Sequence, residues 1–98
     1  MSRLLVLSNE AEVDLSAIYD YLLEVNERAL MKFERNLDSL FDRIVEMPLM
    51  YAKVWRTVRA ARVRRFRYVV YYIVHRKVID IVAVIHAARD SSAWKSRL

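Results

Sequence analysis

The sequence predicts an α+β fold, in which a pair of helices packs on one small, mostly antiparallel sheet in the order β-α-α-β-β-β. Apolar residues recur every three or four positions over residues 11–47, which is the period of a helix. They run almost without interruption over residues 68–74 and 78–86, which is typical of strands covered on both faces. With 98 residues, 56% of them hydrophobic, we expect a single domain over residues 1–98 with a substantial core.

The first predicted elements are a strand over residues 4–7 and a helix that follows it. Residues 4–7 form a short apolar run, and the Ser8 side chain after it is suited to cap a helix. The apolar stripe of this helix consists of Ala11, Leu15, Ile18, Leu22 and Val25. Asn26 interrupts the stripe, and we expect it to end the helix in a left-handed conformation, which asparagine tolerates better than most residues.

A second helix is predicted to follow at once and, because the connection is short, to run antiparallel to the first. Its apolar stripe consists of Leu30, Phe33, Leu37, Leu40, Ile44 and Met47. Pro48 ends this helix, because proline lacks a backbone N–H and disfavours helical geometry at the residue before it. We expect residues 49–54 to form a loop.

An irregular edge strand is predicted next, over residues 56–64. Val58 and Ala60 have one parity along this strand, whereas Val63 has the other. Successive side chains of a strand point to opposite faces, so this change of parity near residues 60–62 predicts a bulge or irregular pairing.

Two longer strands complete the predicted sheet. Residues 68–74 and 78–86 are separated by a charged turn at residues 75–77. Asp80 is the only charged residue within the second of these strands. Residues 87–98 are expected to form a tail beyond the sheet.

Charge is distributed unevenly along the chain. Residues 1–52 carry five Lys or Arg and ten Asp or Glu, whereas residues 53–98 carry twelve and two, so the halves have net charges of −5 and +10. Six of the arginines lie within residues 56–67, next to a predicted strand. A basic surface held on a folded scaffold suits phosphate groups or an acidic protein segment.

The composition excludes several classes of site. The chain has no glycine, so it has no glycine-rich phosphate loop, and Asn, Asp, Arg or Lys must occupy turn positions that favour glycine. It has no cysteine, which excludes disulfides and zinc–thiolate sites and favours a cytoplasmic location. We expect no cofactor and no metal, because no histidine accompanies the first helix's Asp14, Asp20 and Glu24, which we expect to be solvated. The N-terminal apolar run is too short for a signal peptide or membrane span, so no membrane association is expected.

The order of elements and three sequence motifs resemble the RelE/ParE superfamily of bacterial toxins from type II toxin–antitoxin, or plasmid stabilization, modules. The motifs are R-R-F-R-Y-V-V-Y-Y-I-V at residues 64–74, I-V-A-V-I-H-A-A-R-D-S-S-A-W at residues 81–94 and E-A-E-V-D-L-S-A-I-Y-D-Y-L at residues 10–22. The resemblance covers nearly the whole chain. Where many relatives have Phe-Pro-Tyr, this chain has Phe66-Arg67-Tyr68, which adds a positive charge.

This resemblance implies one of two activities. RelE-like members cut messenger RNA in the ribosomal A site without a metal, using basic groups to stabilise the attacked phosphate. ParE-like members inhibit DNA gyrase by protein–protein contact and cleave nothing. By position, Arg64 and Arg89 match the phosphate-binding arginines of RelE-like members. His86 resembles a histidine common in ParE-like members and is a conceivable general acid.

The sequence favours the ParE-like activity, because the nuclease set is incomplete. The C-terminal tyrosine of RelE-like members has no counterpart, since Trp94 and Lys95 stand in that region, and their lysine pair is reduced to Lys53. If the chain is an enzyme, we expect a metal-independent endoribonuclease. For His86, a hydrogen bond to the backbone at the end of a strand is favoured over a catalytic role. For Arg64 and Arg89, phosphate binding on the one hand and a solvated sheet edge or an antitoxin contact on the other are equally favoured.

Contacts with the target or the antitoxin are predicted for a further set of residues: Arg59, Arg62, Arg65, Arg67, Trp94 and Arg97. Trp55 and Trp94 either stack on nucleic-acid bases or, as we favour, seal the ends of the core. A nucleic-acid-binding module without toxicity is a third possibility, but both helices are amphipathic core helices and neither is typical of a recognition helix.

The resemblance also implies partners. A cognate antitoxin is expected to form a hetero-oligomer with this chain and neutralise it, and the target is DNA gyrase or, in the alternative, the ribosome with its mRNA. We expect a flexible antitoxin segment to lay an amphipathic helix across the helical pair or to add a strand at the sheet edge.

Overall fold

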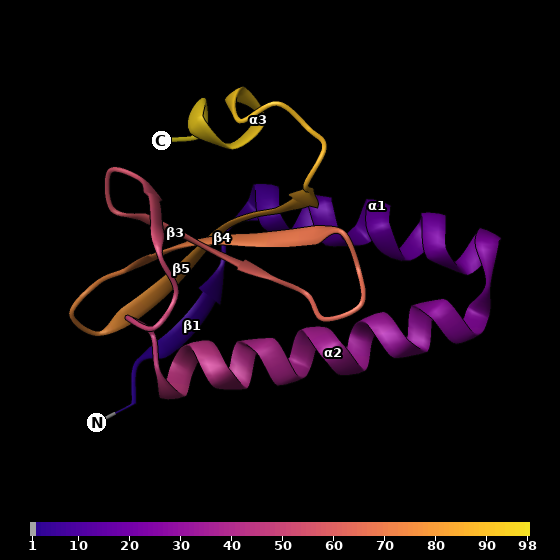
Figure 1. Ribbon diagram of the computed structural model, residues 1–98, viewed down its shortest axis with the longest axis horizontal. Coiled ribbons are helices and arrows are strands. Elements are labelled where there is room, and N and C mark those ends of the chain that lie inside the picture. The colour runs from indigo at the N-terminus through magenta and orange to yellow at the C-terminus, as the bar shows by residue number, and fades with distance from the viewer. Residues whose placement is uncertain (1) are drawn as a thin grey trace.

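A five-stranded sheet lies at the centre of the computed structural model, which describes residues 2–98 (Figure 1). In chain order the elements are β1 (Leu4–Leu7), α1 (Asn9–Val25), α2 (Glu27–Glu46), β2 (Lys53–Trp55), β3 (Val58–Arg62), β4 (Tyr68–Val74), β5 (Val78–His86) and α3 (Ser92–Lys95). The strand order is β1-β5-β4-β3-β2, with β1 parallel to β5 and the other pairs antiparallel. The predicted α+β class is confirmed, with β2 and α3 as elements that the sequence did not predict.

The two long helices begin and end at residues with identifiable capping roles. The Ser8 hydroxyl accepts a hydrogen bond from the Ala11 N–H at 3.0 Å, as a helix cap does. Asn26 alone separates α1 from α2, with φ −171° and ψ 118°, so its predicted left-handed conformation is wrong. Its side-chain oxygen instead accepts from the Arg28 N–H at 2.8 Å and caps α2, which requires extended backbone at that position. The predicted end of the second helix before Pro48 is confirmed.

Arginine occupies the left-handed positions that glycine would favour. Within residues 2–98 the positive φ angles are those of Arg56, at 52°, and Arg65, at 67°. Each lies in a turn, the first between β2 and β3 and the second between β3 and β4. The expectation that a chain without glycine uses Asn, Asp, Arg or Lys at such positions is confirmed by these two arginines.

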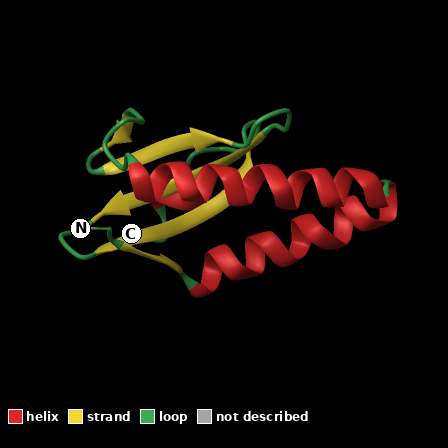
Figure 2. Ribbon diagram, turned by 90° about the horizontal axis from the view of Figure 1, so that it is seen from below, coloured by secondary structure: helices red, strands yellow, loops and turns green. Residues whose placement is uncertain are grey.

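The two long helices lie side by side on one face of the sheet (Figures 1 and 2). Their buried residues are Ala11, Leu15, Ile18, Leu22, Phe33, Leu37, Leu40 and Ile44, and they pack on Ala61, Val63, Val70, Tyr72, Ile79, Ile81 and Val84. These helical positions were predicted from the apolar stripes. Val25 and Met47, at the C-terminal ends of the stripes, are 61% and 49% exposed, so their assignment to the core is wrong.

The opposite face of the sheet has a smaller core of its own. Val58, Val82, Ala83 and Ile85 are buried there together with Trp94 of α3. The Trp94 ring stacks on Tyr71, with ring centroids 4.6 Å apart, and contacts Trp55 edge-on at 5.9 Å. Trp94 is 4% exposed, so the prediction that it seals the core is confirmed.

The predicted irregular edge strand is confirmed only in part: β3 pairs irregularly with β2, with a register shift between Lys53 and Trp55, but the rest of the prediction is wrong. β3 pairs regularly with β4 from Val58 to Arg62, without a bulge near residues 60–62. Its side chains change parity because both faces of the sheet are covered, so apolar residues are required on each. β2 lies outside β3, so β3 is not an edge, and part of the expected loop at residues 49–54 is a strand.

A second register shift, besides that between β2 and β3, lies between β4 and β5. Tyr71 pairs with Ala83 and Tyr72 with Ile81, so Val82 has no partner of its own. This irregularity lies at the middle of β5, next to the candidate site described below.

Candidate functional site

The second half of β5 has no strand beside it on its outer edge. β1 pairs with β5 only from Val78 to Ile81, after which the chain turns into α1. Side chains satisfy backbone groups there instead. The Ser8 hydroxyl donates to the Val82 carbonyl at 3.3 Å, and the Val84 N–H donates to an Asp14 carboxylate oxygen at 3.0 Å. This edge therefore has fixed polar groups, where an open strand would leave them unpaired.

An ion pair closes the same edge. Arg97 donates to both carboxylate oxygens of Asp14, at 2.7 and 2.9 Å, and also to the Val82 carbonyl at 3.1 Å. The two side chains are only 17% and 9% exposed. The hydrogen bonds to Asp14 raise the pKa of Arg97. The expectation of a solvated Asp14 is wrong, because this side of α1 faces β5.

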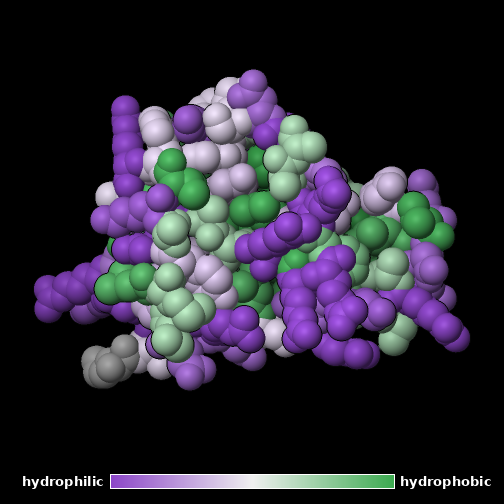
Figure 3. Space-filling model, viewed as in Figure 1, coloured by the Kyte–Doolittle hydropathy of each residue, from purple (hydrophilic) through white to green (hydrophobic). Residues whose placement is uncertain are grey.

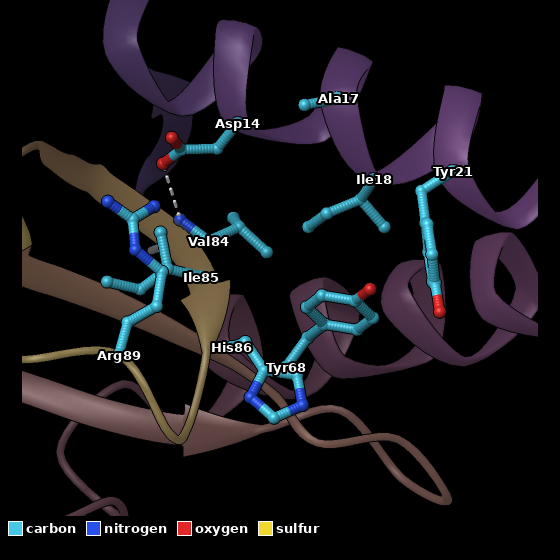
Figure 4. A pocket seen from close by; sticks show the side chains of 9 residues that line it. All are labelled: Asp14, Ala17, Ile18, Tyr21, Tyr68, Val84, Ile85, His86 and Arg89. Carbon is cyan, nitrogen blue, oxygen red and sulfur yellow. Dashed lines mark hydrogen bonds between the residues drawn. The ribbon is translucent and has the colours of Figure 1, made fainter.

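A hollow of about 180 Å³ lies beside this edge, between α1 and the ends of β4 and β5 (Figure 4). Its lining consists of Asp14, Ala17, Ile18, Tyr21, Tyr68, Val84, Ile85, His86 and Arg89. The structure therefore brings together two of the three predicted catalytic residues, His86 and Arg89.

His86 is held by a local hydrogen bond. Its Nδ1 atom accepts from the Ala88 N–H at 3.1 Å, so the proton of the neutral ring lies on Nε2. Its ring contacts Tyr68 edge-on, with centroids 5.7 Å apart. The preferred interpretation of a strand-end histidine bonded to the backbone is confirmed. Among residues 2–98 the ion pairs are His75–Asp80 and Arg97–Asp14, so no described carboxylate pairs with His86.

Two tyrosines of this hollow were missed by the sequence analysis. Figure 4 shows the Tyr68 hydroxyl directed toward Tyr21. Burial, and then the nearby Tyr21, raises the pKa of Tyr68, so its hydroxyl keeps its proton at neutral pH and is a weaker acid than an exposed tyrosine. The signal was available in the alternation of β4, where Tyr68, Val70 and Tyr72 share the face toward the helices.

Arg64, the third predicted catalytic residue, lines different hollows. It lies in the turn between β3 and β4, where its carbonyl accepts from the Asn36 side chain at 2.9 Å. One hollow, of about 380 Å³, is lined by Lys32, Arg35, Asn36, Arg64 and Arg65. A second, of about 150 Å³, is lined by Asn36, Ser39, Leu40, Arg43, Arg62 and Arg64.

The predicted contact residues divide into two groups. Arg62, Arg65 and Arg67 are exposed in and beside the turn between β3 and β4. The others have roles inside the fold: Arg59 donates to the Leu49 and Tyr51 carbonyls at 3.2 and 2.6 Å, while Trp94 and Arg97 hold the C-terminal segment in place. Binding by any of these residues stays a prediction.

No group of three His, Cys, Asp or Glu side chains within residues 2–98 is arranged to hold a metal ion. No helix in this part of the chain combines the length and the apolar character that a membrane span needs. The polar groups gathered at the hollow are arginine, histidine and tyrosine side chains and the Asp14 carboxylate, which is paired with Arg97, and this set suits anions or a protein surface.

Comparisons with known proteins give consistent results. Residues 5–91 match the family described as "ParE toxin of type II toxin-antitoxin system, parDE". Curated relatives named "Toxin ParE2", from two strains of Mycobacterium tuberculosis, are 27% identical over 99 positions, covering 100% of this chain and 94% of the relative. A solved structure described as "Chromosomal ParDE TA system from P. aeruginosa" shares the fold, with a TM-score of 0.72 and 20% identity, covering 87% of this chain and 96% of that chain.

Proposed function

Because the chain belongs to the ParE toxin family of type II toxin–antitoxin systems, we propose that it binds DNA gyrase and inhibits it by protein–protein contact. The observation that carries this proposal is the separation of the residues that a nuclease would use. His86 and Arg89 share one hollow, whereas Arg64 lines two others beside α2. Acid–base catalysis needs its groups within hydrogen-bond reach of the same reacting atoms, so this arrangement favours inhibition by binding.

The chemistry of the shared hollow supports the same proposal. His86 has neither a carboxylate among residues 2–98 to orient it nor a free Nδ1, and the tyrosine beside it has a raised pKa. Arg89 supplies positive charge and hydrogen-bond donors to this hollow. A RelE-like endoribonuclease would have to take its acid and base from elsewhere.

The proposed contact surface consists of the exposed arginines around the turn between β3 and β4 and after β5. These are Arg62, Arg64, Arg65, Arg67 and Arg89. Arginines projecting from a fixed backbone are frequent hot spots of interfaces, worth about 2 kcal/mol or more. We expect Arg64→Ala and Arg89→Ala each to reduce toxicity while the fold is retained, with the exposed Arg76→Ala as the control.

We further propose that the cognate antitoxin covers apolar side chains of the helical pair. At the joined end of α1 and α2, Leu23, Val25 and Met31 are 56%, 61% and 57% exposed. An amphipathic helix of a flexible antitoxin segment would bury them. Strand addition at β1, where Leu4 is 67% exposed, is the other mode that the sheet edge permits. A short acidic protein encoded next to this chain is the expected partner.

Two assays in parallel test the proposed target. Purified protein is added to a DNA gyrase supercoiling reaction and to a reconstituted translating ribosome system. We expect loss of supercoiling and intact messenger RNA. Codon-specific cleavage of the message, with gyrase unaffected, would instead establish the RelE-like endoribonuclease.

A further inference from the structure

The two hollows beside α2 adjoin each other, because Asn36 and Arg64 line both, and we call them together the basic groove. Six cationic side chains border it, from α2, from β3 and from the turn after β3: Lys32, Arg35, Arg43, Arg62, Arg64 and Arg65. Figure 3 shows hydrophilic side chains gathered over this turn and the neighbouring part of α2. The groove is separate from the hollow that contains His86 and Arg89.

The backbone of the groove is fixed before any ligand binds. The Asn36 amide ties α2 to the Arg64 carbonyl at 2.9 Å, and the Arg62 Nε atom donates to the Phe66 carbonyl at 2.8 Å across the turn. Arg65 is held at φ 67°, a conformation that costs a residue with a Cβ atom about 1–2 kcal/mol. These contacts place the arginines of the turn opposite the cations of α2.

No described carboxylate neutralises this charge. The ion pairs of residues 2–98 involve His75, Asp80, Arg97 and Asp14, none of which lines the groove. Four acidic side chains of α2 are not part of the lining either: Glu34 and Asp38 act on Tyr19 of α1, and Asp42 and Glu46 line a neighbouring hollow that shares Ser39 and Arg43 with the groove. Like charges held together repel one another, so an anion in the groove would be bound favourably.

The lining also indicates which anion fits. The larger hollow presents only ammonium, guanidinium and amide groups, without an aromatic ring on which a base could stack or an apolar side chain to anchor a peptide. Phosphate oxygens accept from such donors without further contacts. We propose that the basic groove binds the sugar–phosphate backbone of a double-stranded nucleic acid, with Lys32, Arg35, Arg64 and Arg65 as its phosphate ligands. This proposal does not depend on gyrase as the target.

The test measures binding of the isolated full chain to a fluorescently labelled duplex of about 20 base pairs by anisotropy, over a range of salt concentrations. Four phosphate contacts predict a slope of log K against log salt of about −4, since each contributes about −0.9. Two duplexes of unrelated sequence should bind equally. Arg64→Gln combined with Arg65→Gln should weaken binding to both and reduce the slope by about 2.

The matched control is Arg76→Gln combined with Lys77→Gln. It removes the same charge from an exposed turn, the one between β4 and β5, which does not line the groove. The proposal requires the control to bind within about twofold of wild type with an unchanged slope. Equal weakening by both double variants would overturn it, because the binding would then reflect net charge alone. Thermal unfolding of both variants checks that the fold is intact.

Two further arms identify the ligand. Duplex DNA and duplex RNA are compared directly, and groove-dependent binding of either supports the proposal and identifies the source of the phosphates. A polyglutamate peptide that displaces the duplex at equal charge concentration would assign the groove to an acidic protein segment and overturn it. Loss of gyrase inhibition with intact duplex binding would bear on the proposed function only.

Discussion

The two faces of the sheet are covered by different means. On one face, two long amphipathic helices bury a continuous core with fully enclosed residues such as Phe33 and Ile44. On the other, a single turn of helix places Trp94 against Tyr71, and the segment is held by the pair between Arg97 and Asp14. The first face depends on apolar periodicity, whereas the second depends on a few specific contacts made by the last residues of the chain.

Two adjacent residues of β4, Tyr71 and Tyr72, lie on opposite faces of the sheet. Tyr72 is fully buried beneath the helices and donates its hydroxyl to the Pro48 carbonyl at 2.8 Å. Tyr71 points to the opposite face and stacks on Trp94. We therefore expect substitutions on the helical face to affect global stability, and those on the other face to affect chiefly the C-terminal segment.

The largest effect is expected on the helical face. Ile44 is fully buried, so Ile44→Ala should lower the free energy of unfolding by about 2–5 kcal/mol, through lost apolar contact and a residual cavity. Asp38→Ala, on the exposed side of the same helix, should change it by less than about 0.5 kcal/mol. Urea denaturation followed by circular dichroism measures both. Similar losses for the two variants would contradict the assigned faces of α2.

Alkaline pH should also destabilise the helical face. Burial raises the pKa of Tyr72 to about 12, against about 10 in the unfolded chain. The unfolded state therefore loses its proton first, so stability is complete below pH ~10 and falls as the pH rises through ~12. The difference of two units between the folded and unfolded pKa corresponds to a loss of about 3 kcal/mol in the free energy of unfolding.

The measurement is the urea midpoint as a function of pH, with Tyr72→Phe as the comparison. That variant should lose about 1 kcal/mol at neutral pH, because the hydrogen bond to Pro48 is absent. Between pH 10 and 12, the urea midpoint of this variant should also decline less than that of wild type. A decline equal to that of wild type would show that another group titrates.

The helical face is also the part of the fold that could be predicted from the sequence. Its stripes, Ser8 as a cap and Pro48 as a stop are local signals, and all were confirmed except Val25 and Met47 at the ends of the stripes. The opposite face depends on contacts between positions far apart, above all that of Asp14 with Arg97. A carboxylate on a helix surface looks solvated until its distant partner is placed.

The candidate site shows the same limit. The arginines between β3 and β4 and the end of β5 were predicted to be functional, since charge density and motif are visible in the sequence. Which of them share a hollow was not predictable. Arg64 and Arg89 were placed in one catalytic set by resemblance, yet they line different hollows. Arg59 was predicted as a contact residue, but its guanidinium donates to the loop before β2.

The ion pair that ties the C-terminal segment to α1 should have a measurable coupling energy. We expect a double-mutant cycle of Asp14→Ala and Arg97→Ala to give about 1–3 kcal/mol, because the pair is bidentate and largely shielded from water. Either single variant should also speed hydrogen exchange of the amides of residues 92–98 while those of α2 stay protected. A coupling energy near zero would mean that the aromatic stack alone holds the segment.

The smallest effects are expected at the two arginines with left-handed backbone conformation. Arg65 lies beside α2 on the helical side, and Arg56 lies beside Trp55 on the opposite side. Arg65→Gly should raise the free energy of unfolding by about 0.5–1 kcal/mol, because glycine adopts φ 67° without strain, although its greater freedom in the unfolded chain offsets part of the gain. Arg56 differs, because its guanidinium lies 4.2 Å from the centroid of the Trp55 ring, a contact worth about 0.5–1 kcal/mol. Arg56→Gly removes the strain and the contact together and should be nearly neutral. Thermal unfolding of both variants decides the matter: stabilisation at position 56 equal to that at 65 would show that the contact with Trp55 contributes nothing to that face.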